Sequence, residues 1–238
     1  MKSIFHLAIN DFKHVFRDKM LYVFLFAPVA LICFVRFFVP FIAAIYPVVN
    51  EYTSYIMMFG GIQTAIMFGF ITAFIILEEK DENVLQAIRV LPVSPVYFIS
   101  YRLLFATCFS AIAAFFMLLF SNLAWPGYIN SVLLAVHYGL AAPFITLLIA
   151  TYAKNKIEGL GFFKGIDLLI LIPIVGFFLP DGWKYMMSFV PVFWTYELYH
   201  ASLSGTSVVF PFLTGLILYL LVFVLLAKQF QKRVFGGL

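Results

Sequence analysis

Six long apolar runs dominate this chain and constrain its fold more than any other feature of the sequence. They lie at approximately residues 20–44, 54–77, 96–124, 131–153, 165–179 and 208–227. A helix rises about 1.5 Å per residue, so about 20 mostly apolar residues cross about 30 Å of hydrocarbon. Charged residues make up only 11% of the chain, whereas soluble domains have about 25%. The sequence therefore predicts an integral membrane protein and excludes a soluble globular domain.

The continuity of these runs favours helices over a β-barrel, whose strands alternate apolar and polar residues in segments of about ten. The predicted fold class is all-α integral membrane, with six transmembrane helices in a single domain of residues 1–238. Cys33 and Cys108 lie inside apolar runs and indicate no disulfide or metal framework. The first 19 residues are too polar to supply the apolar region of a cleavable signal peptide.

The N-terminal residues 4–16 show an amphipathic pattern. Phe5, Ile9 and Phe12 recur at helical spacing, and charged residues fill much of the opposite face. Such a helix lies in the membrane interface rather than crossing the bilayer. We expect an interfacial helix within residues 1–19, and a short soluble arm is the alternative.

Basic residues are distributed unevenly between the two ends of the predicted spans. With a cytoplasmic N-terminus, 13 of the 15 lysines and arginines lie on the cytoplasmic side, and only Arg36 and Lys184 lie outside. An excess of Lys and Arg in cytoplasmic loops sets the orientation of membrane proteins. Six spans return the C-terminus to the same side, so both termini are predicted to be cytoplasmic, in the inner (plasma) membrane of the cell.

Residues 180–205 lie on the predicted outer side, yet they are rich in Trp, Phe, Tyr and Met. Pro191 and Gly205 make this region too broken for one straight span, and its apolar character makes a free loop costly. We expect a pair of short re-entrant helices packed against the spans, because irregular backbone at membrane depth must be buried in protein or reached by water. An interfacial aromatic belt without re-entry is the alternative.

The segment 78–95 interrupts the apolar pattern between the second and third runs. Its charges begin with Glu78 and Glu79, at the expected N-terminal end of a helix, where the macrodipole favours acids. Pro92 and Pro95 end that helix. Its apolar face is formed by Val84, Leu85, Ile88 and Leu91. The sequence predicts a short amphipathic cytoplasmic helix, with a solvated connecting loop as the alternative.

This segment resembles the signature of the type-2 ATP-binding-cassette exporter permeases, in particular the small six-span bacterial drug- or fluoroquinolone-export type. The matching residues are Glu78, Glu79, Lys80 and Glu82, then Leu85, and finally Leu91, Pro92, Val93 and Ser94. Asn83 stands where the family usually has glycine, and Arg102 stands where a lysine is usual. Residues 17–19, 154–159 and 190–194 resemble the family's basic turn after an elbow helix, its loop between spans four and five, and its outer re-entrant helices.

The resemblance implies that segment 78–95 is a coupling helix that docks on a separate ATPase subunit, present in two copies. Its coupling residues would be Glu78, Glu79, Glu82, Val84, Leu85, Ile88 and Leu91. Two copies of the chain, or the chain and a paralogue, would enclose a substrate path within the membrane lipid. ATP and magnesium would bind to the partner, so the chain itself would be no enzyme and would bind no cofactor, metal or nucleic acid. Consistently, its sequence has no G-x-x-x-x-G-K-[ST] phosphate loop and no H-E-x-x-H or G-x-S-x-G motif.

Polar residues at membrane depth are further candidates for function. Gln63 and Thr64 lie midway along the second run and are candidates for the substrate path, with hydrogen bonding between helices as the alternative. Asp167 is expected near the cytoplasmic end of the fifth span, with Lys164 as a structural partner. The candidate residues of an outer gate are Pro191, Trp194, Glu197 and His200.

Two other functions compete with an ATP-driven exporter. A secondary transporter driven by an ion gradient would have carboxylates buried in mid-span and internal repeats, and the sequence shows neither. A membrane scaffold without transport would not need an amphipathic cytoplasmic helix. The pattern therefore favours the exporter permease.

Overall fold

The computed structural model describes residues 11–82, 95–180 and 182–236, and every regular element in these ranges is helical. Residues 11–17 are helical, in agreement with the amphipathic pattern there. The elements that follow are α2 (Lys19–Ile45), η1 (Pro47–Tyr52), α3 (Thr53–Asp81), α5 (Pro95–Phe120), α6 (Tyr128–Tyr152), α7 (Lys156–Gly176), η2 (Trp183–Met187), α8 (Pro191–Ser204), α9 (Val209–Phe230) and η3 (Gln231–Phe235).

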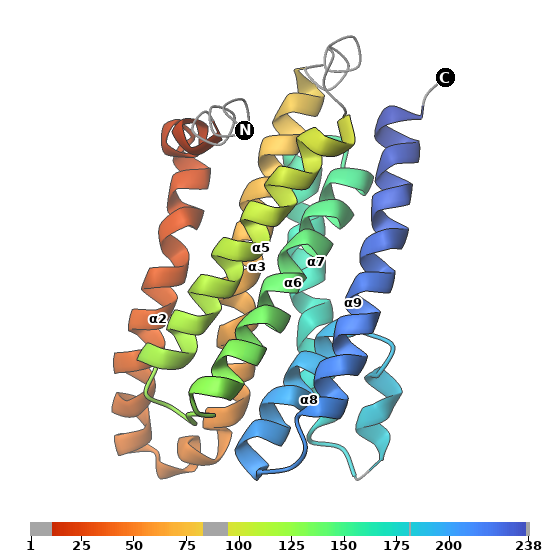
Figure 1. The fold of residues 1–238 in the computed structure, drawn as a ribbon. Helices are drawn as coiled ribbons and strands as arrows, with labels where there is room; N and C mark the ends of the chain where they lie inside the picture. Colours follow the sequence, from red (N-terminus) through yellow and green to blue (C-terminus); the bar gives the residue numbers. More distant parts are fainter. Residues whose placement is uncertain (1–10, 83–94, 181, 237–238) are drawn as a thin grey trace.

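Six of these helices are long and apolar enough to cross a membrane: α2, α3, α5, α6, α7 and α9. Each overlaps one predicted apolar run, so the prediction of an all-α membrane protein with six spans is confirmed. The spans run up and down as a bundle, and the described ends near the two termini lie at the same end of it (Figure 1). We call this end, which carries Asp18, Asp81 and Tyr152, the charged end, and the end that carries η1, η2 and α8 the aromatic end.

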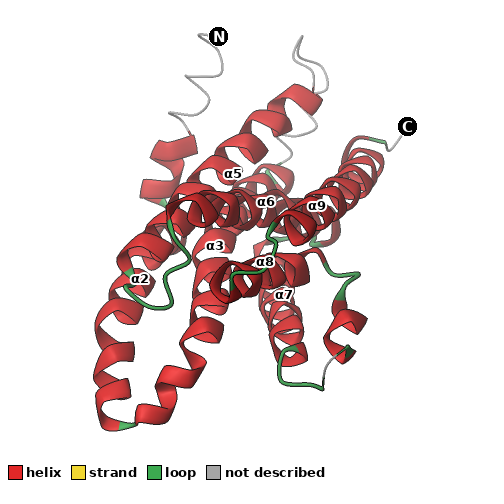
Figure 2. Cartoon of the chain, turned by 60° about the horizontal axis from the view of Figure 1, so that its bottom comes forward, coloured by secondary structure: helices red, strands yellow, loops and turns green. Residues whose placement is uncertain are grey.

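Helix α3 is the central helix of the bundle, as the tilted view in Figure 2 shows. In its most apolar 18-residue window 89% of the residues are buried, against 17% in α2 and in α9. It packs against α2, α5, α6 and α7, whereas α9 packs mainly against α6 and α8. The outward faces of α2 and α9 are large, apolar and exposed, as expected for surfaces that contact lipid.

Small residues bring α3, α5 and α6 close together. A Cβ atom on Gly69 of α3 would lie 2.6 Å from the carbonyl oxygen of Ala142 in α6, and the Thr146 hydroxyl donates to the Gly69 carbonyl oxygen at 2.8 Å. The hydroxyl of Ser110 in α5 donates to the Ala65 carbonyl oxygen of α3 at 2.6 Å. In a membrane, where lipid is as apolar as the helix surface, such close backbone contact and hydrogen bonding hold spans together.

Helix α7 begins nine residues earlier than predicted, because Asn155 and Glu158 form a helix-start motif. The Asn155 side chain accepts a hydrogen bond from the Glu158 amide at 2.9 Å, and the Glu158 carboxylate accepts one from the Lys154 amide at 2.8 Å. This reciprocal pattern is a capping box with asparagine as the N-cap. The prediction of a span that begins only at residue 165 was therefore wrong, and the connection from α6 to α7 is only about three residues long.

Helix α8 packs among the spans, as expected for the core of region 180–205. Pro191 begins it at the first helical turn, and Gly205 ends it with a left-handed φ of 70°. The Tyr196 hydroxyl donates to the Ile170 carbonyl oxygen of α7 at 3.2 Å, and the Tyr199 hydroxyl donates to the Ala124 carbonyl oxygen before α6 at 2.6 Å. The neighbouring η2 and Phe189 are largely exposed, so the close packing is confined to α8.

Candidate functional site

Three consecutive side chains in the last turns of α3 connect that helix to its neighbours. Glu78 pairs with Lys156 at the start of α7, Glu79 pairs with Arg102 of α5, and the Lys80 ammonium donates to the carbonyl oxygen of Ala153 at the end of α6. Helix α3 therefore continues through the charged cluster instead of ending before it. We call these three residues with their partners the charged clamp.

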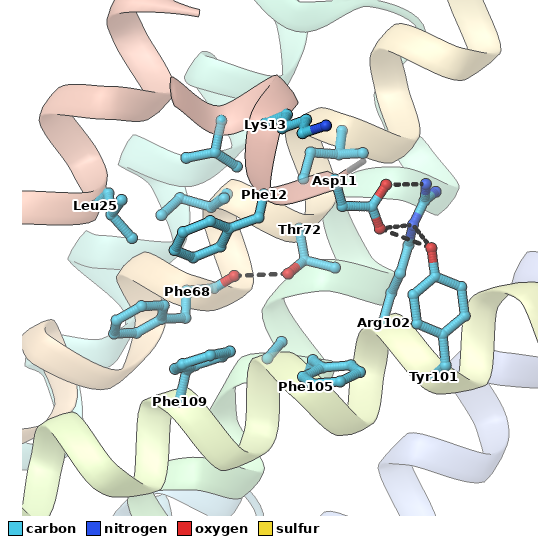
Figure 3. Close-up of a pocket in the computed structure, with 14 residues that line it drawn as sticks. Asp11, Phe12, Lys13, Leu25, Phe68, Thr72, Tyr101, Arg102, Phe105 and Phe109 are labelled. Carbon is cyan, nitrogen blue, oxygen red and sulfur yellow. Dashed lines mark hydrogen bonds and ion pairs between the residues drawn. The ribbon is translucent and has the colours of Figure 1, made fainter. Parts of the chain in front are cut away.

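Arg102 is the most buried of the ion-paired residues in the clamp, with 4% of its side chain exposed. Its Nη2 donates to Asp11 Oδ1 and to Glu79 Oε1, each at 2.7 Å, and its Nε donates to Asp11 Oδ2 at 2.8 Å. A further bond joins Nη1 to the Glu79 carboxylate. The Tyr101 hydroxyl donates to Asp11 at 2.7 Å, and Figure 3 shows Asp11, Tyr101 and Arg102 together. One guanidinium thus ties the helical segment 11–17 to α3 and α5, and charge-assisted bonds of this kind are the strong ones.

Lys156 provides a second connection on the other side of α3. Its ammonium lies 2.6 Å from Glu78 Oε2 and 2.9 Å from Asp18 Oδ2, and His14 Nε2 lies 3.0 Å from the same Glu78 oxygen. Asp18 also caps α2, since its Oδ1 accepts hydrogen bonds from the Met20 and Leu21 amides. The charged clamp therefore joins segment 11–18, α3, α5, α6 and α7 at one end of the bundle.

A cavity of about 460 Å³ opens beside the clamp, between segment 11–17, α2, α3 and α5. Figure 3 shows Asp11, Tyr101 and Arg102 at one end of it and aromatic side chains at the other. The rings of Phe68 and Phe109 stack with centroids 5.8 Å apart. Its volume falls within the range of about 300–1,000 Å³ that small-molecule sites occupy.

A polar pair lies deeper in the bundle, where Gln63 of α3 donates to Asp167 Oδ1 of α7 at 3.1 Å. Because α7 begins at Lys156, Asp167 lies near the middle of a span rather than at its cytoplasmic end, and Lys164 forms no ion pair with it. Two expectations were therefore wrong. Lys164 was expected to be the partner of Asp167, but the partner is Gln63, and no carboxylate was expected in mid-span, but Asp167 lies there. Thr64 is fully buried and donates to the Gly60 carbonyl oxygen of its own helix, so it does not face an open path.

The four candidate outer-gate residues all lie on α8, but they have different environments. Pro191 is the first residue of the helix, and Trp194 Nε1 donates to the Ser188 carbonyl oxygen at 2.7 Å. Glu197 pairs with Lys184 of η2 at 2.9 Å, whereas His200 is exposed beside the Phe177 ring. The sequence did not predict that Lys184 is the partner of Glu197.

The structure describes three of the seven predicted coupling residues, Glu78, Glu79 and Glu82. Val84, Leu85, Ile88 and Leu91 lie outside the described residues. Glu82 is exposed as the C-cap of α3, while Glu78 and Glu79 are at the end of α3 and bonded to other helices. Glu78 and Glu79 thus do not begin a separate helix. They lie in the last turns of α3 and form ion pairs with Lys156 of α7 and Arg102 of α5. The sequence did not indicate that Asp11, Tyr101 and Lys156 belong to this site. It indicated only that Arg102 stands where the family usually has a lysine.

Within the ranges that the structure covers, no group of three or more His, Cys, Asp or Glu side chains could hold a metal ion. What these ranges do contain is six apolar spans, a polar pair in mid-span and a charged clamp at one end, which define a multi-pass membrane protein. The chain belongs to the Rv2686c-like family of fluoroquinolones export permease proteins, whose family model matches residues 11–227.

Two curated relatives are similar to this chain over nearly its whole length. They are the fluoroquinolones export permease protein Rv2686c of Mycobacterium tuberculosis strain ATCC 25618 / H37Rv and the fluoroquinolones export permease protein MT2760 of strain CDC 1551 / Oshkosh. Each is 27% identical over 234 residues, which cover 94% of this chain and 92% of the relative. No solved structure matches the chain significantly.

Proposed function

We propose that this chain is the membrane-spanning permease subunit of an ATP-driven exporter of the ATP-binding-cassette type, coupled to two separate ATPase subunits that bind ATP and magnesium. The observation that carries the proposal is the charged clamp at the end of α3. Segment 83–94 follows it directly in the sequence and carries the apolar residues of the predicted coupling helix. A push on that segment would act first on the helix that contacts four of the other five spans.

The clamp suggests how such a push would spread. Glu78, Glu79 and Lys80 each contact a different neighbour, so a displacement of the α3 end would pull on α5, α6 and α7 together. Separating a partly buried ion pair is costly because it leaves an uncompensated charge, so these pairs resist being pulled apart. Closure of the ATPase pair would in this way rearrange the spans toward release of substrate on the outer side.

In this proposal the charged end is cytoplasmic and both termini lie in the cytoplasm, in the inner (plasma) membrane of the cell. The excess of Lys and Arg at this end supports that orientation. Region 180–205 then faces outward, with α8 as a re-entrant helix of the outer leaflet. Its packing against α6, α7 and α9 supports this role, because α8 has only 14 residues and is too short to span.

A second copy of the chain, or a paralogue, would complete the path. Support comes from α7, whose Gly161 and Gly165 have open space around their Cβ positions and whose Leu168 and Ile172 are exposed on the same side. Small residues spaced by four allow two spans to approach closely in a membrane. The name of the relatives suggests fluoroquinolones, which are amphipathic aromatic molecules, as the kind of substrate.

The test is association with the ATPase encoded nearby. Replacing Leu85 or Ile88 with Asp would bury an unpaired charge at the docking contact, and we expect at least about a hundredfold loss of ATPase binding without loss of membrane insertion. Gln86→Asp is the matched control, since Gln86 lies on the opposite face of the predicted helix. Co-purification and ATP turnover in proteoliposomes measure the outcome. If Leu85→Asp and Ile88→Asp bind and stimulate the ATPase like the parent protein, the coupling role is wrong.

One observation favours the rival, a secondary transporter driven by an ion gradient: Asp167 is a carboxylate in the middle of a span. The two functions differ in their energy source. Proteoliposomes that hold the permease and the ATPase should accumulate substrate with ATP and without a proton gradient. Accumulation driven by a proton gradient without the ATPase would establish the secondary transporter instead.

A further inference from the structure

Asp167 stands in an unusual position for a carboxylate. It lies 11 residues after the first residue of α7 and nine residues before the last, since 167 − 156 = 11 and 176 − 167 = 9. At about 1.5 Å per residue it is therefore about 16 Å from the start of the helix. Ionisable residues at such depth are rare and face protein or water rather than lipid, because a charge in hydrocarbon is costly.

The carboxylate has one polar neighbour and no cationic one among the described residues. Gln63 donates to Oδ1, and no Lys, Arg or His nitrogen there lies within ion-pair distance. The described acids of the charged clamp and of α8 differ in this respect, since Asp11, Glu79 and Glu197 all pair with basic side chains. An asparagine at position 167 would accept the same bond from Gln63 without carrying a charge, so the hydrogen bond alone does not account for an acid.

Aromatic clusters lie on either side of this pair along the seam between α3 and α7. Toward the charged end, the Phe70 ring lies 4.3 Å from the Phe163 ring and 4.3 Å from the Phe24 ring. Toward the aromatic end, the Tyr55 ring lies 4.5 Å from the Phe178 ring. Phe70 and Phe163 are buried, whereas Asp167 and Tyr55 are partly exposed and Phe178 is exposed, so a ligand can contact these last three side chains. Aromatic faces also attract cations, which complements an anionic group between them.

We propose that Asp167 is the counter-charge for a protonated basic nitrogen on an aromatic substrate, with Gln63 orienting the carboxylate. The substrate class is an amphipathic aromatic amine, whose rings contact the accessible Tyr55 and Phe178 side chains while its nitrogen donates to Asp167. This assignment rests on the exporter function proposed above and names the chemistry of its substrate.

The test measures binding to the full chain, purified and reconstituted in phosphatidylcholine nanodiscs, with empty nanodiscs as the background. The probes are pyrenemethylamine, which is cationic near neutral pH, and pyrenemethanol, which has the same rings without the charge. The parent protein should bind the amine at least about tenfold more tightly, because charge-assisted hydrogen bonds are stronger than neutral ones. Asp167→Asn should abolish this preference and leave the affinity for the alcohol unchanged, and Asp167→Glu should keep it. Asp81→Asn, which removes an exposed carboxylate at the end of α3, is the matched control and should change neither affinity.

A second measurement leaves Asp167 in place, so it holds even if the asparagine variant fails to fold. Leu171→Cys puts a thiol one turn beyond Asp167 on the same side of α7, in a chain whose exposed Cys33 and Cys108 are replaced by serine. Pyrenemethylamine should slow its reaction with a maleimide more than pyrenemethanol does. Any of four results would overturn the assignment. These are equal affinity for the two probes, absence of binding, equal slowing of the maleimide reaction by the two probes, and an amine preference that survives Asp167→Asn. ATPase association is measured in the same preparations. If the ATPase associates but the amine preference is absent, only the proposed cation site is wrong. If the amine preference is present but the ATPase does not associate, only the proposed ATP-driven exporter function is wrong.

Discussion

Arg102→Met is the substitution that most directly tests the charged clamp. Methionine keeps most of the apolar stem and removes the guanidinium, which is 4% exposed and donates to Asp11, Glu79 and Tyr101. The carboxylates of Asp11 and Glu79 are themselves only 20% and 17% exposed. The change therefore leaves two mostly buried negative charges close together without their cation.

The expected loss follows from that geometry. Removing one partner of a buried ion pair costs about 3–5 kcal/mol, because the remaining charge stays buried and uncompensated. The free energy of unfolding of Arg102→Met should fall by about this amount. Adding Asp11→Asn and Glu79→Gln removes both orphaned charges, so the triple variant should recover at least about 1 kcal/mol relative to Arg102→Met.

Unfolding of the purified protein in mixed detergent micelles, titrated with sodium dodecyl sulfate and followed by circular dichroism, measures these differences. Arg17→Met is the matched control, because Arg17 is exposed on the same helical segment and forms no ion pair within the described ranges. It should change the free energy of unfolding by no more than about 0.5 kcal/mol. A loss below about 1 kcal/mol for Arg102→Met, or no recovery in the triple variant, would refute the reasoning.

Two further predictions concern packing and pH. Gly69→Ala should lower the free energy of unfolding by about 1–3 kcal/mol, because the new Cβ would meet the Ala142 carbonyl oxygen at 2.6 Å. Gly176→Ala is the control and should cause no such loss, because its Cβ would lie at an ordinary contact distance of 3.5 Å from the Lys184 backbone; equal effects in the same unfolding titration would contradict this. Burial raises the pKa of Asp18, but its hydrogen bonds with Lys156 and with two backbone amides outweigh burial and place the pKa below the ordinary value of 3.8. A carboxylate with a lowered folded-state pKa contributes stability that is present above its unfolded pKa and is lost as pH falls through the folded one. Unfolding titrations should therefore show that Asp18→Asn is less acid-sensitive below about pH 4 than the parent, and identical profiles would argue against the interaction.

The spans and their number could be predicted because bilayer thickness sets the length of an apolar helix, and composition alone reveals runs of that length. The start of α7 could also have been read locally, since Asn155 and Glu158 have the spacing of a capping box. It was missed because the basic and glycine residues around it indicated a loop. That error moved Asp167 from the middle of a span to its edge.

The choice of partners was beyond the sequence. Lys164 was expected to pair with Asp167 because both were placed near the cytoplasmic end of the fifth span, yet the observed partner, Gln63, is separated from Asp167 by 104 positions. Glu78 and Glu79 indicated a local helix start, whereas their partners are on α7 and α5.

What the sequence by itself determined is the set of membrane spans, their alternating direction and the interruption of region 180–205 at Pro191 and Gly205, because each depends on residues within one helix length. The structure shows that these two residues lie at the two ends of α8. Only the tertiary structure decided which charges are neutralised, which carboxylate remains without a cation among the described residues, and which face of α3 meets each neighbour. These depend on the rotation and tilt of helices that pack against one another, and short-range patterns do not encode the distance between side chains on different helices.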